Sequence, residues 1–198
     1  MKHLKMLGLA AMIAVGLAAF FAAGPASATV LCKTATNPCT EKWPIAQFDF
    51  SLQGTGVWED PFEIKFQECT SATFTTQSTS EFGASISMAV PRVYWGNPES
   101  TCTRTTDVLT KGEMYVEWIE GTANGTLKDT GTSWTVGECT YGFMEKNLLG
   151  TIKGGKPATL EINATVLPLT GGCTLKYRWT AKFGISNGLS SSLYIEKS

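Results

Sequence analysis

Residues 129–133 read Asp-Thr-Gly-Thr-Ser, the pattern with which aspartic proteases hold a catalytic carboxylate. In that chemistry two carboxylates share a proton and activate a water molecule. It requires a second loop of the same kind and an apolar strand before the loop, whereas Lys128 directly precedes Asp129. We therefore interpret the segment as a hairpin turn between strands at 122–127 and 133–136 rather than as a protease loop.

Two pairs of carboxylates lie beside tryptophans and suggest the acid and base of a glycoside hydrolase. They are Glu59 with Asp60, and Glu117 with Glu120. On a strand, however, Glu117 and Glu120 point to opposite faces, and Glu59, Asp60 and Pro61 are typical of a polar turn. A carboxylate-dependent hydrolase therefore stays an alternative to a protein without catalytic residues.

The chain has a single histidine, His3, and it lies in the N-terminal segment expected to be a leader. Without that residue the remaining chain has no imidazole, the usual general base and a common metal ligand. This excludes catalysis by Ser-His or Cys-His nucleophiles and metal sites with histidine ligands. The sequence predicts no catalytic residue, no metal and no cofactor, and hence a protein that is not an enzyme.

The six cysteines are expected to form structural disulfides, because their number is even and no Cys-x-x-Cys pair favours zinc. Six cysteines can pair in 15 ways, and the spacing along the chain favours pairing in sequence order. The expected bonds are Cys32–Cys39, Cys69–Cys102 and Cys139–Cys173.

The six tryptophans divide into two groups by sequence context. Trp118 and Trp179 lie in alternating segments and are expected in the core. Trp43, Trp58 and Trp95 lie in loop-like contexts, where a ring could stack on a sugar or anchor in a partner. These three are the candidate ligand contacts, and they support a carbohydrate-binding module as the second alternative.

The chemistry-bearing residues are separated by short segments in which apolar and polar residues alternate. A period of two predicts half-buried strands, and paired turn residues such as Asn124-Gly125 separate them. About ten strands of this kind favour a single antiparallel β-sandwich or a barrel-like domain. The clearest runs occupy residues 46–52, 62–66, 84–90, 160–166 and 175–183.

The N-terminal segment has the features of a signal peptide. Lys2, His3 and Lys5 precede an apolar run at 7–23, and Ala26-Ser27-Ala28 supplies the small residues of a cleavage site. We expect cleavage after Ala28, with residues 1–28 as signal peptide and 29–198 as a secreted, extracellular domain, either free or associated with the cell envelope. That domain is mildly acidic and has no later apolar stretch of bilayer length, so neither nucleic acid nor a membrane span is expected.

The leader end Ala-Ser-Ala-Thr-Val-Leu-Cys at 26–32 and the recurrent Cys-Thr pairs resemble a group of small exported proteins from actinobacteria. The C-terminal part, from Cys139-Thr140-Tyr141-Gly142 to Leu193-Tyr194, strengthens the resemblance. The resemblance implies an exported, disulfide-bonded β domain and brings no activity, cofactor or catalytic residue. The expected function is that of a structural or protein-interaction module of the cell exterior, with an unidentified protein or a cell-envelope glycan as partner.

Overall fold

The computed structural model describes residues 28–95, 102–103, 106–110, 112–136, 138–143, 147–170, 172–188 and 190–198, with the backbone alone at 91–95 and 106–110. Residues 1–27 of the expected signal peptide lie outside the described residues. The cleavage site after Ala28 therefore stays a prediction.

Eight of the described strands form a closed antiparallel barrel. Each pairs with the next barrel strand along the chain, and β15 closes the ring by pairing with both β14 and β2. The barrel strands are β2 (Gln47–Leu52), β5 (Ala72–Ser78), β7 (Ile86–Trp95), β9 (Glu113–Trp118), β10 (Gly125–Thr130), β13 (Asn147–Lys153), β14 (Ala158–Pro168) and β15 (Tyr177–Ser186). The expected all-β fold is thus confirmed, and it is a barrel rather than two packed sheets.

Side chains alternate along the barrel strands between a packed interior and a polar outer surface. On β5, Phe74 and Thr76 are buried, whereas Thr73 and Gln77 are exposed. Phe74 stacks on Phe50 with ring centroids 4.3 Å apart. An eight-stranded barrel has an interior just wide enough for side chains to fill, and large apolar residues occupy this one.

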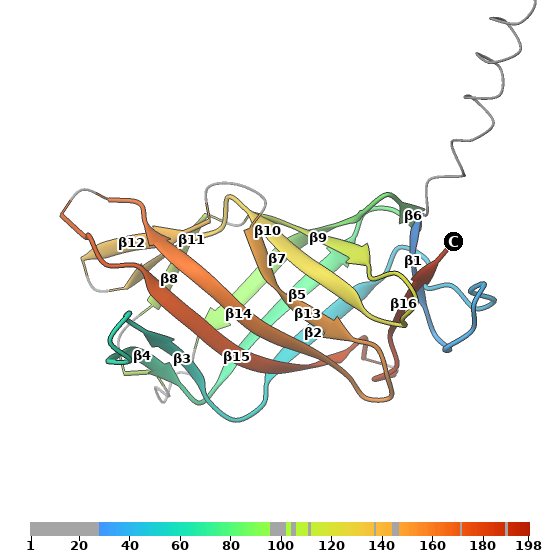
Figure 1. Ribbon diagram of the computed structural model, residues 1–198, viewed down its shortest axis with the longest axis horizontal. Coiled ribbons are helices and arrows are strands. Elements are labelled where there is room, and N and C mark those ends of the chain that lie inside the picture. The colour runs from blue at the N-terminus through green and yellow to red at the C-terminus, as the bar shows by residue number, and fades with distance from the viewer. Residues whose placement is uncertain are drawn as a thin grey trace, which may run out of the picture.

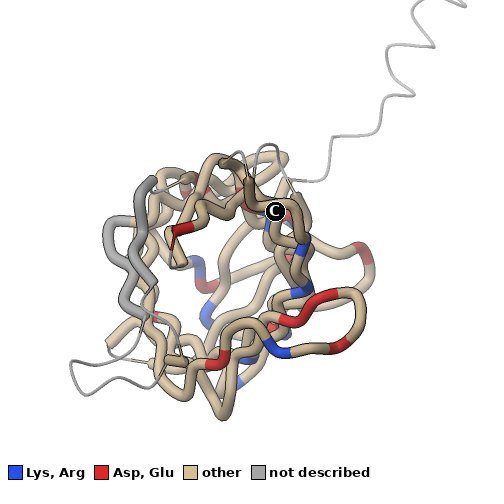
Figure 2. Tube along the Cα trace, turned by 90° about the vertical axis from the view of Figure 1, so that its left-hand side faces the viewer, with Lys and Arg blue, Asp and Glu red and all other residues tan. Residues whose placement is uncertain are grey.

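The β14–β15 hairpin continues beyond the barrel and supports five further strands of the same 13-stranded sheet. This curled extension, which we call the second sheet, occupies the left-hand end of Figure 1. There β3 pairs with β15, and β12 pairs with β14. Figure 2 looks onto this end and shows the strands arranged in a ring. The added strands are β3 (Gly56–Glu59), β4 (Lys65–Cys69), β8 (Thr106–Thr110), β11 (Ser133–Val136) and β12 (Cys139–Gly142).

An aromatic cluster fills the concave side of the second sheet. The rings of Trp58 and Trp134 lie 5.9 Å apart, although their strands, β3 and β11, are separated in the sheet by three others. Tyr141 lies 5.9 Å from Trp58, and Trp179 lies 5.8 Å from Trp134. These contacts require the sheet to curl, and they form the hydrophobic core of this end.

The disulfides join Cys32 to Cys39, Cys69 to Cys102 and Cys139 to Cys173, the sequential pairing that the spacing predicted. The Cys69–Cys102 bond links β4 to the segment before β8, the two outer strands of the second sheet. The Cys139–Cys173 bond ties β12 to the connection between β14 and β15. Two disulfides therefore hold the curled sheet together.

A separate three-stranded sheet covers the opposite end, on the right in Figure 1. It consists of β1 (Thr29–Cys32), β6 (Phe82–Gly83) and β16 (Tyr194–Lys197). Val30, Cys32 and Cys39 form a buried cluster there with Tyr194 packed against it. The Cys32–Cys39 bond thus anchors the loop that follows β1.

Replacing both cysteines of this loop, Cys32→Ala with Cys39→Ala, is expected to lower the free energy of unfolding by about 2 to 3 kcal/mol, the chain-entropy value for a short loop. Urea denaturation of the oxidised proteins measures the change. Reductant added to the double variant serves as the control for the other two disulfides. A loss below about 1 kcal/mol would show that the β1–β16 pairing holds this end without the bond.

Candidate functional site

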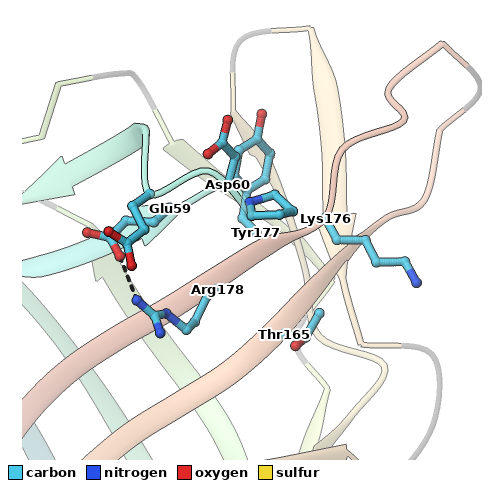
Figure 3. Close-up of a pocket in the computed structure, with 8 residues that line it drawn as sticks. Glu59, Asp60, Thr165, Lys176, Tyr177 and Arg178 are labelled. Atoms are coloured by element: carbon cyan, nitrogen blue, oxygen red, sulfur yellow. Dashed lines mark hydrogen bonds and ion pairs between the residues drawn. The ribbon is translucent and has the colours of Figure 1, made fainter.

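A surface pocket of 310 Å³ lies at the outer end of the second sheet, beside the β3–β4 loop. We call it the rim pocket. It combines acidic and basic side chains with one proline ring and one tyrosine (Figure 3). Its lining residues are Glu59, Asp60, Pro61, Glu63, Thr165, Lys176, Tyr177 and Arg178.

An ion pair forms one wall of the rim pocket. The Nη2 of Arg178 donates to Oε2 of Glu59 at 3.0 Å, the dashed contact of Figure 3. The two residues face each other directly in the β3–β15 ladder, which brings their side chains to the same face. Because the Arg178 side chain is 54 % exposed, solvent screens the pair, which contributes about 1 kcal/mol or less to stability, and its main effect is to orient the guanidinium.

Asp60 organises the loop between β3 and β4. Its Oδ1 accepts hydrogen bonds from the backbone N–H of Phe62 at 2.8 Å and of Ile64 at 2.9 Å. Its own N–H donates to the carbonyl oxygen of Ile64 at 3.0 Å, and Glu63 adopts a φ of 63° at the turn. The carboxylate of Asp60 therefore holds the backbone, and Glu59 is committed to Arg178. Both carboxylates of this candidate hydrolase pair therefore make contacts that stabilise the fold.

The same loop presents two large apolar side chains to solvent. Phe62 is 80 % exposed and Ile64 is 65 % exposed. Leu175, next to the pocket residue Lys176, is 47 % exposed. We call Phe62, Ile64 and Leu175 the apolar tip. Single exposed apolar residues are ordinary, whereas several large ones on neighbouring segments are typical of a binding surface.

The prediction of a half-buried strand at 62–66 is wrong at its start, since β4 begins at Lys65. Phe62 and Ile64 continue the alternation of β4, but the hydrogen bonds to Asp60 fold their backbone into a turn. The preceding Glu-Asp-Pro sequence was the local signal for that turn. The apolar tip was not among the sequence-predicted site residues.

The assignment of Trp43 and Trp58 as ligand contacts is wrong, because both side chains are buried. Trp58 is 3 % exposed and belongs to the aromatic cluster. Trp43 is 9 % exposed, packs edge-on against Phe48 at 5.9 Å and lies under the ammonium of Lys33 at 5.0 Å. Trp95 ends β7, and its side chain lies outside the described residues. The candidate sugar-binding face is therefore not formed by Trp43 and Trp58.

Asp129 lies inside the fold and is 1 % exposed, whereas the sequence predicted a hairpin turn there. The prediction is wrong because β10 pairs with β9 and β13, and β11 pairs with β8 and β12. At Gly131, with a φ of 77°, the chain passes from the barrel into the second sheet. The Asp-Thr-Gly segment is thus a junction between the two parts of the fold.

The Asp129 carboxylate accepts two hydrogen bonds from Thr132, one from the backbone N–H at 3.3 Å and one from the hydroxyl at 2.7 Å. Burial raises the pKa of Asp129 from its ordinary 3.8 to about 6, and the hydrogen bonds from Thr132 oppose that shift. The Thr132 hydroxyl oxygen also accepts from the N–H of Gly112 at 3.1 Å. Through the Thr132 hydroxyl, the Asp129 carboxyl is therefore linked to Gly112, the residue that precedes β9.

The second candidate pair of carboxylates makes different contacts. Glu117 forms an ion pair with Lys128 at 2.6 Å on the outer surface of the barrel. Glu120 is exposed in the turn that follows β9. Neither residue lines the rim pocket.

Within the described part of the chain, no group of three or more His, Cys, Asp or Glu side chains is arranged to hold a metal ion. Over those same residues, no helix has the length and apolar character needed to cross a bilayer.

The fold and the rim define a disulfide-bonded, all-β barrel domain that carries an apolar loop tip beside a charged pocket. Three disulfides indicate an oxidising environment, consistent with an extracellular protein. Comparison with protein-family models, with curated proteins and with solved structures finds no match to this chain.

Proposed function

We propose that the chain is a secreted, non-catalytic module of the cell exterior that binds a protein partner through the apolar tip. The 80 % exposure of Phe62 carries the proposal, because burying an aromatic side chain in a partner is a common source of binding energy. The resemblance to exported actinobacterial proteins is part of this proposal, and the three disulfides agree with export.

The order of the loop supports a binding role. Two hydrogen bonds to Asp60 fix the backbone on either side of Glu63. A loop that is ordered before binding loses little conformational entropy when a partner covers it. The rim pocket adjoins the loop and offers charged groups for a polar border around the apolar contact.

The carbohydrate-binding alternative has lost two of its three candidate tryptophans, since Trp43 and Trp58 are in the core. The hydrolase alternative is weakened because Glu59 and Asp60, which share the rim pocket, both make structural contacts. A protein-binding surface at the tip is the function that the described residues support best.

A photoreactive phenylalanine analogue at position 62 is expected to crosslink the secreted protein to a protein on the surface of washed cells of the producing organism. The matched control places the analogue at position 148, because Leu148 is also an exposed apolar residue, 53 % exposed, but lies on the barrel strand β13. Mass spectrometry identifies the adducts. Equal labelling from both positions, or no adduct from position 62, would contradict the proposal.

A further inference from the structure

The charges around the apolar tip are divided between two segments. The end of β3 and the loop that follows it contribute three carboxylates, those of Glu59, Asp60 and Glu63. The facing segment, where β15 begins, contributes the cations of Lys176 and Arg178. One cation and two of the carboxylates are already used, because Glu59 binds Arg178 and Asp60 binds the loop backbone.

Glu63 and Lys176 form no ion pair with any residue that the structure describes. They lie on opposite segments of the rim pocket, and Figure 3 shows the Lys176 side chain extending away from the Glu59–Arg178 pair. The surface therefore has an available anion on one side, an available cation on the other and apolar side chains beside them.

Such a surface is complementary to itself under twofold rotation. In a twofold interface the same patch is used by both subunits, so a contact from residue i to residue j occurs twice. Rotation places the acidic loop of one copy against the basic segment of the other, while the apolar tips meet near the axis. The rim pocket, at 310 Å³, offers space to receive the Phe62 ring of the partner.

We propose that the partner at the apolar tip is a second copy of this chain, joined through Phe62 packing and reciprocal contacts between Glu63 and Lys176. This inference rests on the proposed function and names its partner. It makes the chain a self-associating structural module of the cell exterior.

Sedimentation equilibrium of the purified secreted protein is expected to show a concentration-dependent dimer. Phe62→Ser should raise the dissociation constant at least about tenfold, as loss of a central aromatic anchor does. Leu148→Ser removes an exposed apolar residue elsewhere and should leave the dissociation constant unchanged.

Charge exchange tests the orientation of the two copies. Glu63→Lys and Lys176→Glu should each weaken the dimer, because each places like charges together in both contacts. An equimolar mixture of these two variants should form a heterodimer, and the double variant should dimerise again. A chain that stays monomeric, or a dimer that these substitutions do not affect, would overturn the inference.

The crosslinking experiment separates failure of this inference from failure of the proposed function. An adduct from position 62 with the mass of two copies supports both. An adduct with a different protein, from a chain that stays monomeric, leaves the proposed function standing and overturns self-association. Absence of both adduct and dimer contradicts both.

Discussion

Trp58→Ala is expected to lower the free energy of unfolding by about 3 to 5 kcal/mol, the usual cost of deleting a buried tryptophan ring. Trp58 is 3 % exposed, and its ring contacts Trp134, Tyr141 and Trp179. Those residues come from β11, β12 and β15, so the ring joins strands from both sides of the curled sheet. Its removal leaves a cavity that the disulfide-bonded sheet can close only in part.

Phe62→Ala is the matched control, since it deletes an aromatic ring only four positions away that is 80 % exposed. Its effect on stability is expected to stay within about 0.5 kcal/mol. Guanidinium denaturation followed by circular dichroism measures both variants. A Trp58→Ala protein as stable as the wild type would contradict the packing described here and return Trp58 to the candidate ligand contacts.

The contrast between these two aromatic residues shows what alternation alone predicts. For β14 the period of two correctly placed Leu160, Ile162, Ala164 and Val166 inside the fold. The same rule applied to Phe62 failed, because the side chain of Asp60 competes for the backbone N–H groups that a continuing strand would use.

The burial of Trp58 depends on residues far away in the sequence. A tryptophan before Glu-Asp-Pro resembles a loop residue, and its ring is covered by β11, β12 and β15, many residues later. Closure of the barrel depends in the same way on pairing between β2 and β15, from opposite ends of the described chain. Neither contact has a local signal, so the sequence left sandwich and barrel undecided.

A local sequence pattern indicated the burial of Asp129, but the match to the Asp-Thr-Gly motif led to a different interpretation. Gly125, Leu127 and Asp129 alternate along β10, and all three are buried. Extending the period of two by one step would have placed the carboxyl inside the barrel. The rim pocket had no comparable signal, because it forms only where β3 pairs with β15.

The buried carboxyl of Asp129 is expected to make the protein less stable at pH 7 than at pH 4. A pKa raised from 3.8 to about 6 in the folded state corresponds to about 3 kcal/mol. The stability is fully present below pH 3.8, where the group is protonated in both the folded and the unfolded chain. It is lost as the pH rises through about 6, because the folded state must then hold a buried charge.

Asp129→Asn is expected to remove this pH dependence and to raise the free energy of unfolding at pH 7 by up to about 3 kcal/mol. The amide is neutral and has the shape of the acid. Its carbonyl oxygen can accept from the Thr132 N–H, and its NH₂ group can donate to the Thr132 hydroxyl oxygen in place of the bond that this hydroxyl donates to the carboxylate. Asp129→Ala removes the charge and both hydrogen bonds, so its free energy of unfolding at pH 7 should lie below that of the Asn variant.

Urea denaturation of the wild type and the Asn variant between pH 4 and 7.5 measures the effect as a difference, which cancels other groups such as Glu196, whose pKa burial also raises. Glu120→Gln, in an exposed turn, controls for the loss of one carboxylate from the chain. A difference that stays constant across the range would show that Asp129 is ionised at all these pH values. The two hydrogen bonds from Thr132 would then outweigh burial, and the junction between barrel and second sheet would be built around a carboxylate anion.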